Sequence, residues 1–135
     1  METVGSKRSR ELRQHLAARF QLEESVISAA LMMLIGSIHD RLSRAVEVSL
    51  VSWIPETWGL LHNDGRDLFG AGVRGVEAIK ARVVAAGVPE AGAFVAELMT
   101  FIERRCGRPL AESIRRRIPE FVEIEKEHSA APAAS

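Results

Sequence analysis

Several residue types are scarce in this 135-residue chain, and each scarcity narrows the range of folds and functions. Tyrosine is absent and aromatic residues make up only 5% of the chain, although 47% of its residues are hydrophobic. This mixture favours helices packed on helices over a β-sheet. Lys and Arg together number 18, as do Asp and Glu, so the net charge is zero. Attraction to nucleic acid or to anionic membranes would therefore have to come from a local patch.

Three further absences concern cellular location. The single cysteine, Cys106, has no partner for an internal disulfide, so nothing in the chain requires an oxidising compartment. The first 13 residues are polar and basic and lack the apolar core of a signal peptide. The longest apolar run, residues 26–38, is too short to span a bilayer. We therefore expect a cytoplasmic protein.

The chain resembles itself in two places, residues 29–56 and residues 93–120. A shift of 64 residues aligns them without a gap and makes nine of 28 positions identical. Chance would give roughly two identities at average residue frequencies. The identities are Ala29/Ala93, Leu34/Leu98, Ile38/Ile102, Arg41/Arg105, Arg44/Arg108, Ser49/Ser113, Ile54/Ile118, Pro55/Pro119 and Glu56/Glu120. We interpret the two segments as copies of one αα-hairpin.

Apolar residues spaced three and four apart predict two helices in each copy. Residues 23–42 are expected to form a long helix that is apolar around most of its circumference, and hence the central buried helix. Ser43 is expected to cap a shorter helix that ends at Pro55. In the second copy, Pro109 is expected to start the short helix and Pro119 to end it.

The other segments complete an all-α bundle of about six helices. Residues 1–20 predict an amphipathic helix that packs on the core, with a detached basic arm as the alternative. Residues 21–127 form the duplicated hairpin domain, in which a helix over residues 73–86 joins the two hairpins. Residues 128–135 are rich in alanine and proline and are expected to be a disordered tail.

The two copies differ most in charge. Residues 104–117 contain six arginines against Glu112, a sum of +5, whereas residues 40–53 sum to zero. Arginine matches the geometry of phosphate and carboxylate groups, so this cluster is a candidate face for an anionic partner. The alternative is a solvated face balanced by the acidic residues of 120–127. The candidate residues are Arg104, Arg105, Arg108, Arg115, Arg116 and Arg117.

Two tryptophans, Trp53 and Trp58, lie on either side of Pro55 and have no tryptophan counterpart in the second copy. Tryptophan at an exposed helix end often marks a contact surface, so both are candidate contact residues. The alternative interpretation is that one or both cover the core.

No pattern of metal ligands or catalytic residues is evident. The residues of suitable type are His39, Asp40, His62, Asn63, Asp64 and Asp67. Their spacing matches no metal site, so we expect no metal and no cofactor. Cys106 aligns with Leu42 and is interpreted as a small buried hydrophobic residue; the alternative is a nucleophile activated by nearby arginines. The chain lacks the common nucleophile and phosphate-loop motifs, and we expect no enzymatic activity.

The unit of a long apolar helix, a short helix and Ile-Pro-Glu resembles small bacterial domains of unknown function built from two helical hairpins that each end in Leu/Ile-Pro. The residues that carry the resemblance are Leu34, Ile38, Arg41, Leu42, Val46, Leu50 and Ile54-Pro55, with Leu98, Ile102, Leu110, Ile114 and Ile118-Pro119 in the second copy. The resemblance implies an all-α fold and no known activity.

Three hypotheses for function follow from the sequence. The first is a non-enzymatic protein-interaction or assembly module, with a homodimer as one form. The second is binding of an anionic ligand or nucleic acid by the arginines of the second hairpin. The third is binding of an apolar small molecule or lipid between the hairpins, near Met32 and Met33.

Overall fold

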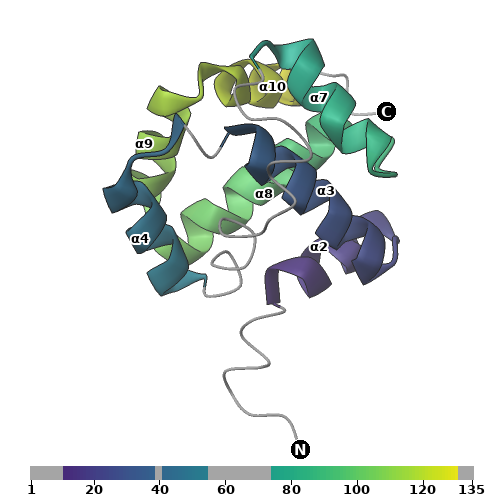
Figure 1. Ribbon diagram of the computed structural model, residues 1–135, viewed down its shortest axis with the longest axis horizontal. Coiled ribbons are helices and arrows are strands. Elements are labelled where there is room, and N and C mark those ends of the chain that lie inside the picture. The colour runs from purple at the N-terminus through teal and green to yellow at the C-terminus, as the bar shows by residue number, and fades with distance from the viewer. Residues whose placement is uncertain (1–10, 39–40, 55–73, 131–135) are drawn as a thin grey trace, which may run out of the picture.

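The computed structural model describes residues 11–38, 41–54 and 74–130. These residues are almost entirely helical and include no strand, which confirms the all-α fold class (Figure 1). They form seven helices, more than the predicted number of about six. The helices are α2 (Glu11–Phe20), α3 (Glu24–Ile38), α4 (Arg44–Trp53), α7 (Val76–Ala85), α8 (Ala91–Cys106), α9 (Arg108–Arg117) and α10 (Pro119–Ala130).

Helix α8 is the centre of the bundle. It packs against α10, α9, α7, α2 and α4, and its Phe94, Val95, Leu98 and Met99 are buried (Figure 1). The expectation that the helix over residues 23–42 would be central is therefore wrong. That helix is α3, which ends at Ile38 and packs mainly on α7 and α2. An apolar circumference predicts burial but does not say which helix the others surround.

Helices α4 and α9 begin and end 64 residues apart, as the alignment of the two copies requires. The residues that follow them, Ile54 and Ile118, have nearly the same backbone angles (φ −129° and −128°, ψ 83° and 77°). Each donates its N–H to the carbonyl four residues back, Leu50 and Ile114. Ser43 caps α4 as predicted, because its Oγ accepts a hydrogen bond of 3.2 Å from the Val46 N–H. The internal duplication itself stays a prediction.

The packing of α4 differs from the predicted hairpin. Its main contacts are with α9 and α8 of the second copy rather than with α3 (Figure 1). The buried residues Val46 and Leu50 form the packed face of α4, and Ile54 is buried just after it. Short helices of this kind gain most of their stability from such tertiary packing.

The N-terminal helix α2 covers α3 and α8 through its buried Leu12 and Leu16, the face that the sequence predicted. Phe20 adds a tilted ring contact with Phe94 at 5.8 Å between centroids. On the polar side, the His15 Nε2 lies 3.0 Å from a carboxylate oxygen of Glu97 on α8. The first ten residues of the predicted segment lie outside the described residues.

Pro119 does more than end α9, because it also begins α10. Only Ile118 separates the two helices, and Phe121 and Ile124 of α10 are buried against α8 and its neighbours. Helix α10 continues to Ala130, so residues 128–130 are helical rather than part of a disordered tail. The rest of the predicted tail, residues 131–135, lies outside the described residues.

Candidate functional site

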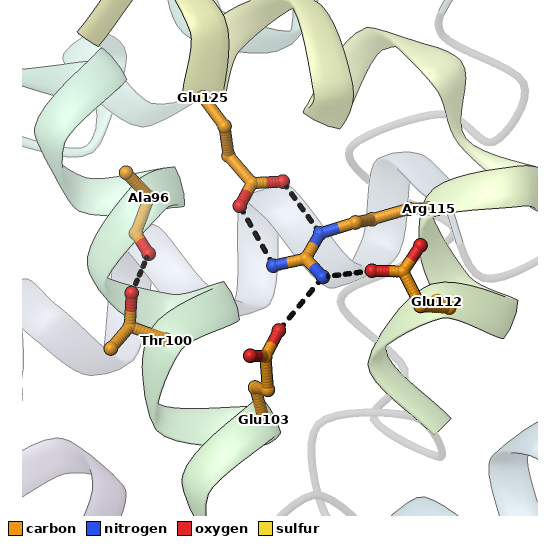
Figure 2. Close-up of polar contacts among 6 residues, drawn as sticks. All are labelled: Ala96, Thr100, Glu103, Glu112, Arg115 and Glu125. Atoms are coloured by element: carbon orange, nitrogen blue, oxygen red, sulfur yellow. Dashed lines mark hydrogen bonds and ion pairs between the residues drawn. The ribbon is translucent and has the colours of Figure 1, made fainter. Parts of the chain in front are cut away.

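The six candidate arginines do not form one face. Arg115 is the most strongly engaged, because it points toward Glu103, Glu112 and Glu125 (Figure 2), and its side chain is only 16% exposed. Its Nε and Nη2 each donate a 2.9 Å hydrogen bond to the carboxylate of Glu125 on α10. Its Nη1 donates to Glu103 on α8 at 2.9 Å and to Glu112 at 2.7 Å. Hydrogen bonding with Glu125, assisted by Glu103 and Glu112, raises the pKa of Arg115. Arg115 therefore joins three helices and is not available to a partner.

Arg105 is engaged in a similar way. Its two terminal nitrogens donate to the carboxylate of Glu11 on α2, at 2.6 and 2.7 Å. Its guanidinium also lies over the ring of Phe101, 5.3 Å from the centroid. Planar pairing of this kind positions a carboxylate firmly. Arg105 thus holds the N-terminal helix on α8.

The other four arginines, Arg104, Arg108, Arg116 and Arg117, are exposed. Among the described residues, the structure records no carboxylate paired with any of them. Arg104 and Arg108 lie at the junction of α8 and α9, whereas Arg116 and Arg117 lie in the last turn of α9. Eight residues of helix separate Arg108 from Arg116, about 12 Å along the axis. The predicted single basic face is therefore two separate pairs.

One of these pairs, Arg116 and Arg117, lines a hollow between α4 and α9. The start of α4 lies beside the end of α9, and between them is a space of about 340 Å³. Arg116 is oriented there by a 3.3 Å hydrogen bond from its Nη2 to the hydroxyl of Ser113. The residues that line the hollow are Ser43, Ala45, Val46, Ser113, Arg116 and Arg117. It therefore contains cationic and hydroxyl groups and no carboxylate.

A buried ion pair holds the two sides of this hollow together. Arg41, two residues before Ser43, donates two hydrogen bonds of 2.6 and 3.1 Å to Glu120, three residues after Arg117. The two side chains are only 9% and 12% exposed. Glu120 also accepts a 2.7 Å hydrogen bond from the backbone N–H of Gly75. Hydrogen bonding from Arg41, with a smaller contribution from Gly75, lowers the pKa of Glu120 to about 2.

Sequence reasoning missed this ion pair, although a signal was present. Arg41/Arg105 and Glu56/Glu120 are two of the nine identities between the copies. An arginine and a glutamate shared by both copies, outside the apolar stripe, could have been read as a pair that joins one copy to the other. Arg41 and Glu120 form such a pair. Their counterparts in the alignment are Arg105, which contacts Glu11, and Glu56, which lies outside the described residues.

Of the two candidate contact tryptophans, Trp53 lies within the described residues and Trp58 does not. Trp53 is 54% exposed at the end of α4, and Val48 on the same helix is 60% exposed. The only other large apolar side chain exposed to this degree in the described residues is Val84 of α7, at 50%. Two of these three exposed apolar side chains thus lie on one short helix.

The other candidate residues, Cys106 and those of metal-ligand type, do not form a site in the part of the chain that the structure describes. Cys106 is half-buried, and desolvation, opposed by Arg105, raises the pKa of its thiol to about 11. The thiol is therefore protonated at neutral pH, which disfavours the nucleophile interpretation. Of the residues of metal-ligand type, His39, Asp40, His62, Asn63, Asp64 and Asp67 lie outside the described residues. Within residues 11–38, 41–54 and 74–130, no three acidic, histidine or cysteine side chains cluster as metal ligands would.

Comparisons with protein-family models, with curated proteins and with solved structures give no match for this chain. The resemblance to bacterial two-hairpin domains therefore stays a prediction. None of the helices in the described ranges has both the length and the apolarity needed to cross a membrane.

Proposed function

We propose that this protein is a non-enzymatic, cytoplasmic protein-interaction module that binds an acidic partner. Its contact surface, called here the outer α4–α9 surface, consists of the exposed residues of these two helices. They are Arg44, Ala45, Val48, Ser52, Trp53, Arg108, Pro109, Arg116 and Arg117.

The observation that carries this proposal is the composition of the outer α4–α9 surface. It contains four arginines and two large apolar side chains, Val48 and Trp53. The acidic residues of these two helices are Glu47, which is partly buried, and Glu112, whose carboxylate pairs with Arg115.

The whole chain has no net charge, so this surface carries an excess of positive charge, with Arg108 about 12 Å along α9 from Arg116. Apolar anchors beside unpaired arginines are typical of protein contact sites, where Trp and Arg contribute much of the binding energy. Charge complementarity then favours an acidic partner.

The proposed duplication explains how such a surface could arise. In two copies of a hairpin, the inward-facing residues must preserve the packing of α4 on α9. The outward-facing residues do not take part in this packing and can change. Trp53 and Arg117 are equivalent in the alignment, yet one is apolar and the other cationic. If a duplicated hairpin acquired a binding surface, its outward-facing residues would be expected to differ between the two copies.

The other two hypotheses have less support. The hypothesis that all six arginines bind nucleic acid has less support because Arg105 and Arg115 are already paired with carboxylates. The hypothesis of an apolar ligand between the hairpins has less support because the hollow between α4 and α9 is lined by two arginines and two serines beside Ala45 and Val46. Met32 packs against the core instead.

The chain offers a matched pair of variants for the test, Val48→Glu on α4 and Val84→Glu on α7. Both valines are at least half exposed, so the same substitution adds the same charge at two surface sites. The probe is a fluorescein-labelled amphipathic helical peptide with glutamate on one face and leucine on the other, measured by fluorescence polarisation. We expect Val48→Glu to weaken binding at least tenfold and Val84→Glu to change it less than twofold.

Three outcomes would contradict the proposal. The first is equal binding of the acidic peptide by both variants. The second is equal binding of a peptide with lysine in place of glutamate. The third is a concentration-dependent dimer of the wild-type protein in sedimentation velocity that Val48→Glu abolishes, which would identify the occupant of the surface as another copy of the chain, in place of an acidic partner.

A further inference from the structure

We infer that the hollow between the start of α4 and the end of α9 binds a phosphate monoester dianion. This inference goes beyond protein docking on the outer α4–α9 surface, because a small ligand would suffice and Val48 and Trp53 do not line the hollow. Its volume of about 340 Å³ is at the lower end of the range for small-molecule sites.

The lining supplies the groups that a phosphate requires. Arg116 and Arg117 each present a guanidinium, which can donate two parallel hydrogen bonds to phosphate oxygens. The hydroxyls of Ser43 and Ser113 add further donors. Ser43 Oγ accepts from the Val46 N–H and Ser113 Oγ accepts from Arg116, so each hydroxyl proton is still available for donation. Two cations and two hydroxyls suit a dianion with three terminal oxygens better than a single carboxylate.

The hollow differs in charge from the neighbouring ion-pair cluster around Arg115. Arg115, one residue earlier, is surrounded by the carboxylates of Glu103, Glu112 and Glu125. Arg116 and Arg117 have no recorded carboxylate partner among the described residues, and no carboxylate lines the hollow. A bound anion would therefore provide the negative charge that compensates Arg116 and Arg117.

The fold also fixes the position of this site. The Arg41–Glu120 ion pair joins the segment before α4 to the segment after α9, close to both sides of the hollow. The four hydrogen bonds of Arg115 fix the last turn of α9, which carries the two lining arginines. A site whose supporting residues are already held in place loses less conformational entropy on binding.

The test is a titration of the ¹⁵N-labelled protein with inorganic phosphate, followed by amide chemical shifts at constant ionic strength. We expect saturable shifts at Ser43–Val46 and Ser113–Arg117. The double variant Arg116→Ala/Arg117→Ala should weaken binding at least tenfold. The matched control, Arg104→Ala/Arg108→Ala, removes the same charge from the other exposed pair and should change the affinity less than twofold.

The pH dependence gives a second readout. The second pKa of a phosphate monoester is about 6, so binding of a monoester should strengthen between pH 5.5 and pH 7.5. Sulfate is a dianion at both values and should bind equally well at the two. A phosphoserine peptide and a nucleoside monophosphate, run as separate arms, distinguish the source of the monoester; binding of either at the hollow supports the inference.

Three results would overturn the inference. The first is an equal loss of phosphate binding in both double variants. The second is chemical shift changes that grow linearly without saturation. The third is a single-stranded oligonucleotide that binds with the same affinity as the monoesters and equally well to both double variants. Val48→Glu should leave phosphate binding unchanged. A failure of the docking proposal can therefore be told apart from a failure of this one.

Discussion

Helices α4 and α9 use equivalent inward positions, while their outward positions differ except at the shared Arg44 and Arg108. Leu50 and Ile114 occupy equivalent buried positions, and Ile54 and Ile118 end their helices with nearly the same backbone geometry. Outward, α4 presents Val48 and Trp53, whereas α9 presents Arg116 and Arg117. Inward positions are restricted by close packing, while exposed positions can change at little cost in stability. The comparison therefore separates what the fold requires from what it leaves open for binding.

A second contrast lies within α9 itself. Arg115 and Arg116 are neighbours of the same residue type, yet the helix turns them toward different surroundings. Arg115 meets three carboxylates, and Arg116 meets the Ser113 hydroxyl and the hollow. Charge counted along the sequence treats the two as equal. Only their surroundings show that one stabilises the fold and the other is available to a ligand.

The largest expected effect concerns the Arg41–Glu120 ion pair. Glu120→Gln leaves Arg41 buried without its counter-charge, and we expect it to reduce the free energy of unfolding by about 3 kcal/mol at pH 7. Glu123→Gln, an exposed change on the same helix, should cost less than about 0.5 kcal/mol. Urea denaturation measures both. Equal values for the two variants would contradict the structural role of the pair.

The same pair predicts a pH dependence. The pKa of Glu120 in the folded protein, about 2, is below that of a glutamate in an unfolded chain, about 4.3. The stabilisation is therefore fully present above about pH 5 and is lost as the pH falls toward 2. The difference in unfolding free energy between wild type and Glu120→Gln should shrink between pH 7 and pH 3. A difference that stays constant over this range would argue against the lowered pKa.

The next effect tests the contrast within α9. Arg115→Ala removes four charge-assisted hydrogen bonds and leaves Glu103, Glu112 and Glu125 close together without their cation. We expect a loss of about 2 kcal/mol in the free energy of unfolding. Arg116→Ala should change it by less than about 0.5 kcal/mol. If the two alanine variants unfolded at the same urea concentration, the assignment of Arg115 to the fold would be wrong.

The smallest effect concerns the two helix starts. Ser43 caps α4 with φ −75°, whereas the equivalent Gly107 has φ +97° and provides no side-chain cap to α9. Gly107→Ser would add a capping hydroxyl worth about 1 kcal/mol but places a serine in a glycine conformation that costs roughly 1–3 kcal/mol. We expect a net loss of about 1 kcal/mol in urea denaturation. The nearest atom to the new Cβ would be Pro109 Cδ at 3.7 Å, so the cost is in the backbone. A variant more stable than wild type would show that the two starts are interchangeable.

Much of the local structure could be predicted from the sequence. The spacing of apolar residues placed α4, α7 and α9 within a few residues of their bounds, and the Ser43 cap was identified from residue type. Helix length was less predictable, since α3 ends at Ile38 rather than at residue 42. Helix α10 was missed as a separate helix because a proline that ends one helix can equally begin the next.

The candidate site could be predicted only in part. The arginine cluster was identified, but the division into paired and unpaired members was not. The partners of Arg105 and Arg115 come from other helices: Glu11 precedes Arg105 by 94 residues, and Glu125 follows Arg115 by ten. Periodicity describes the face of one helix and says nothing about which carboxylate another helix brings to it.

The sequence alone determined the all-α class, most of the helix bounds and the positions that pack inward, because these depend on local propensity and on periodicity along the chain. Tertiary structure decided that α8 is the central helix, that α4 packs on α9, and that Arg41 contacts Glu120. It also decided which two arginines line a hollow with two serines. These features depend on the relative placement of whole helices, which arises from packing between segments far apart in the chain.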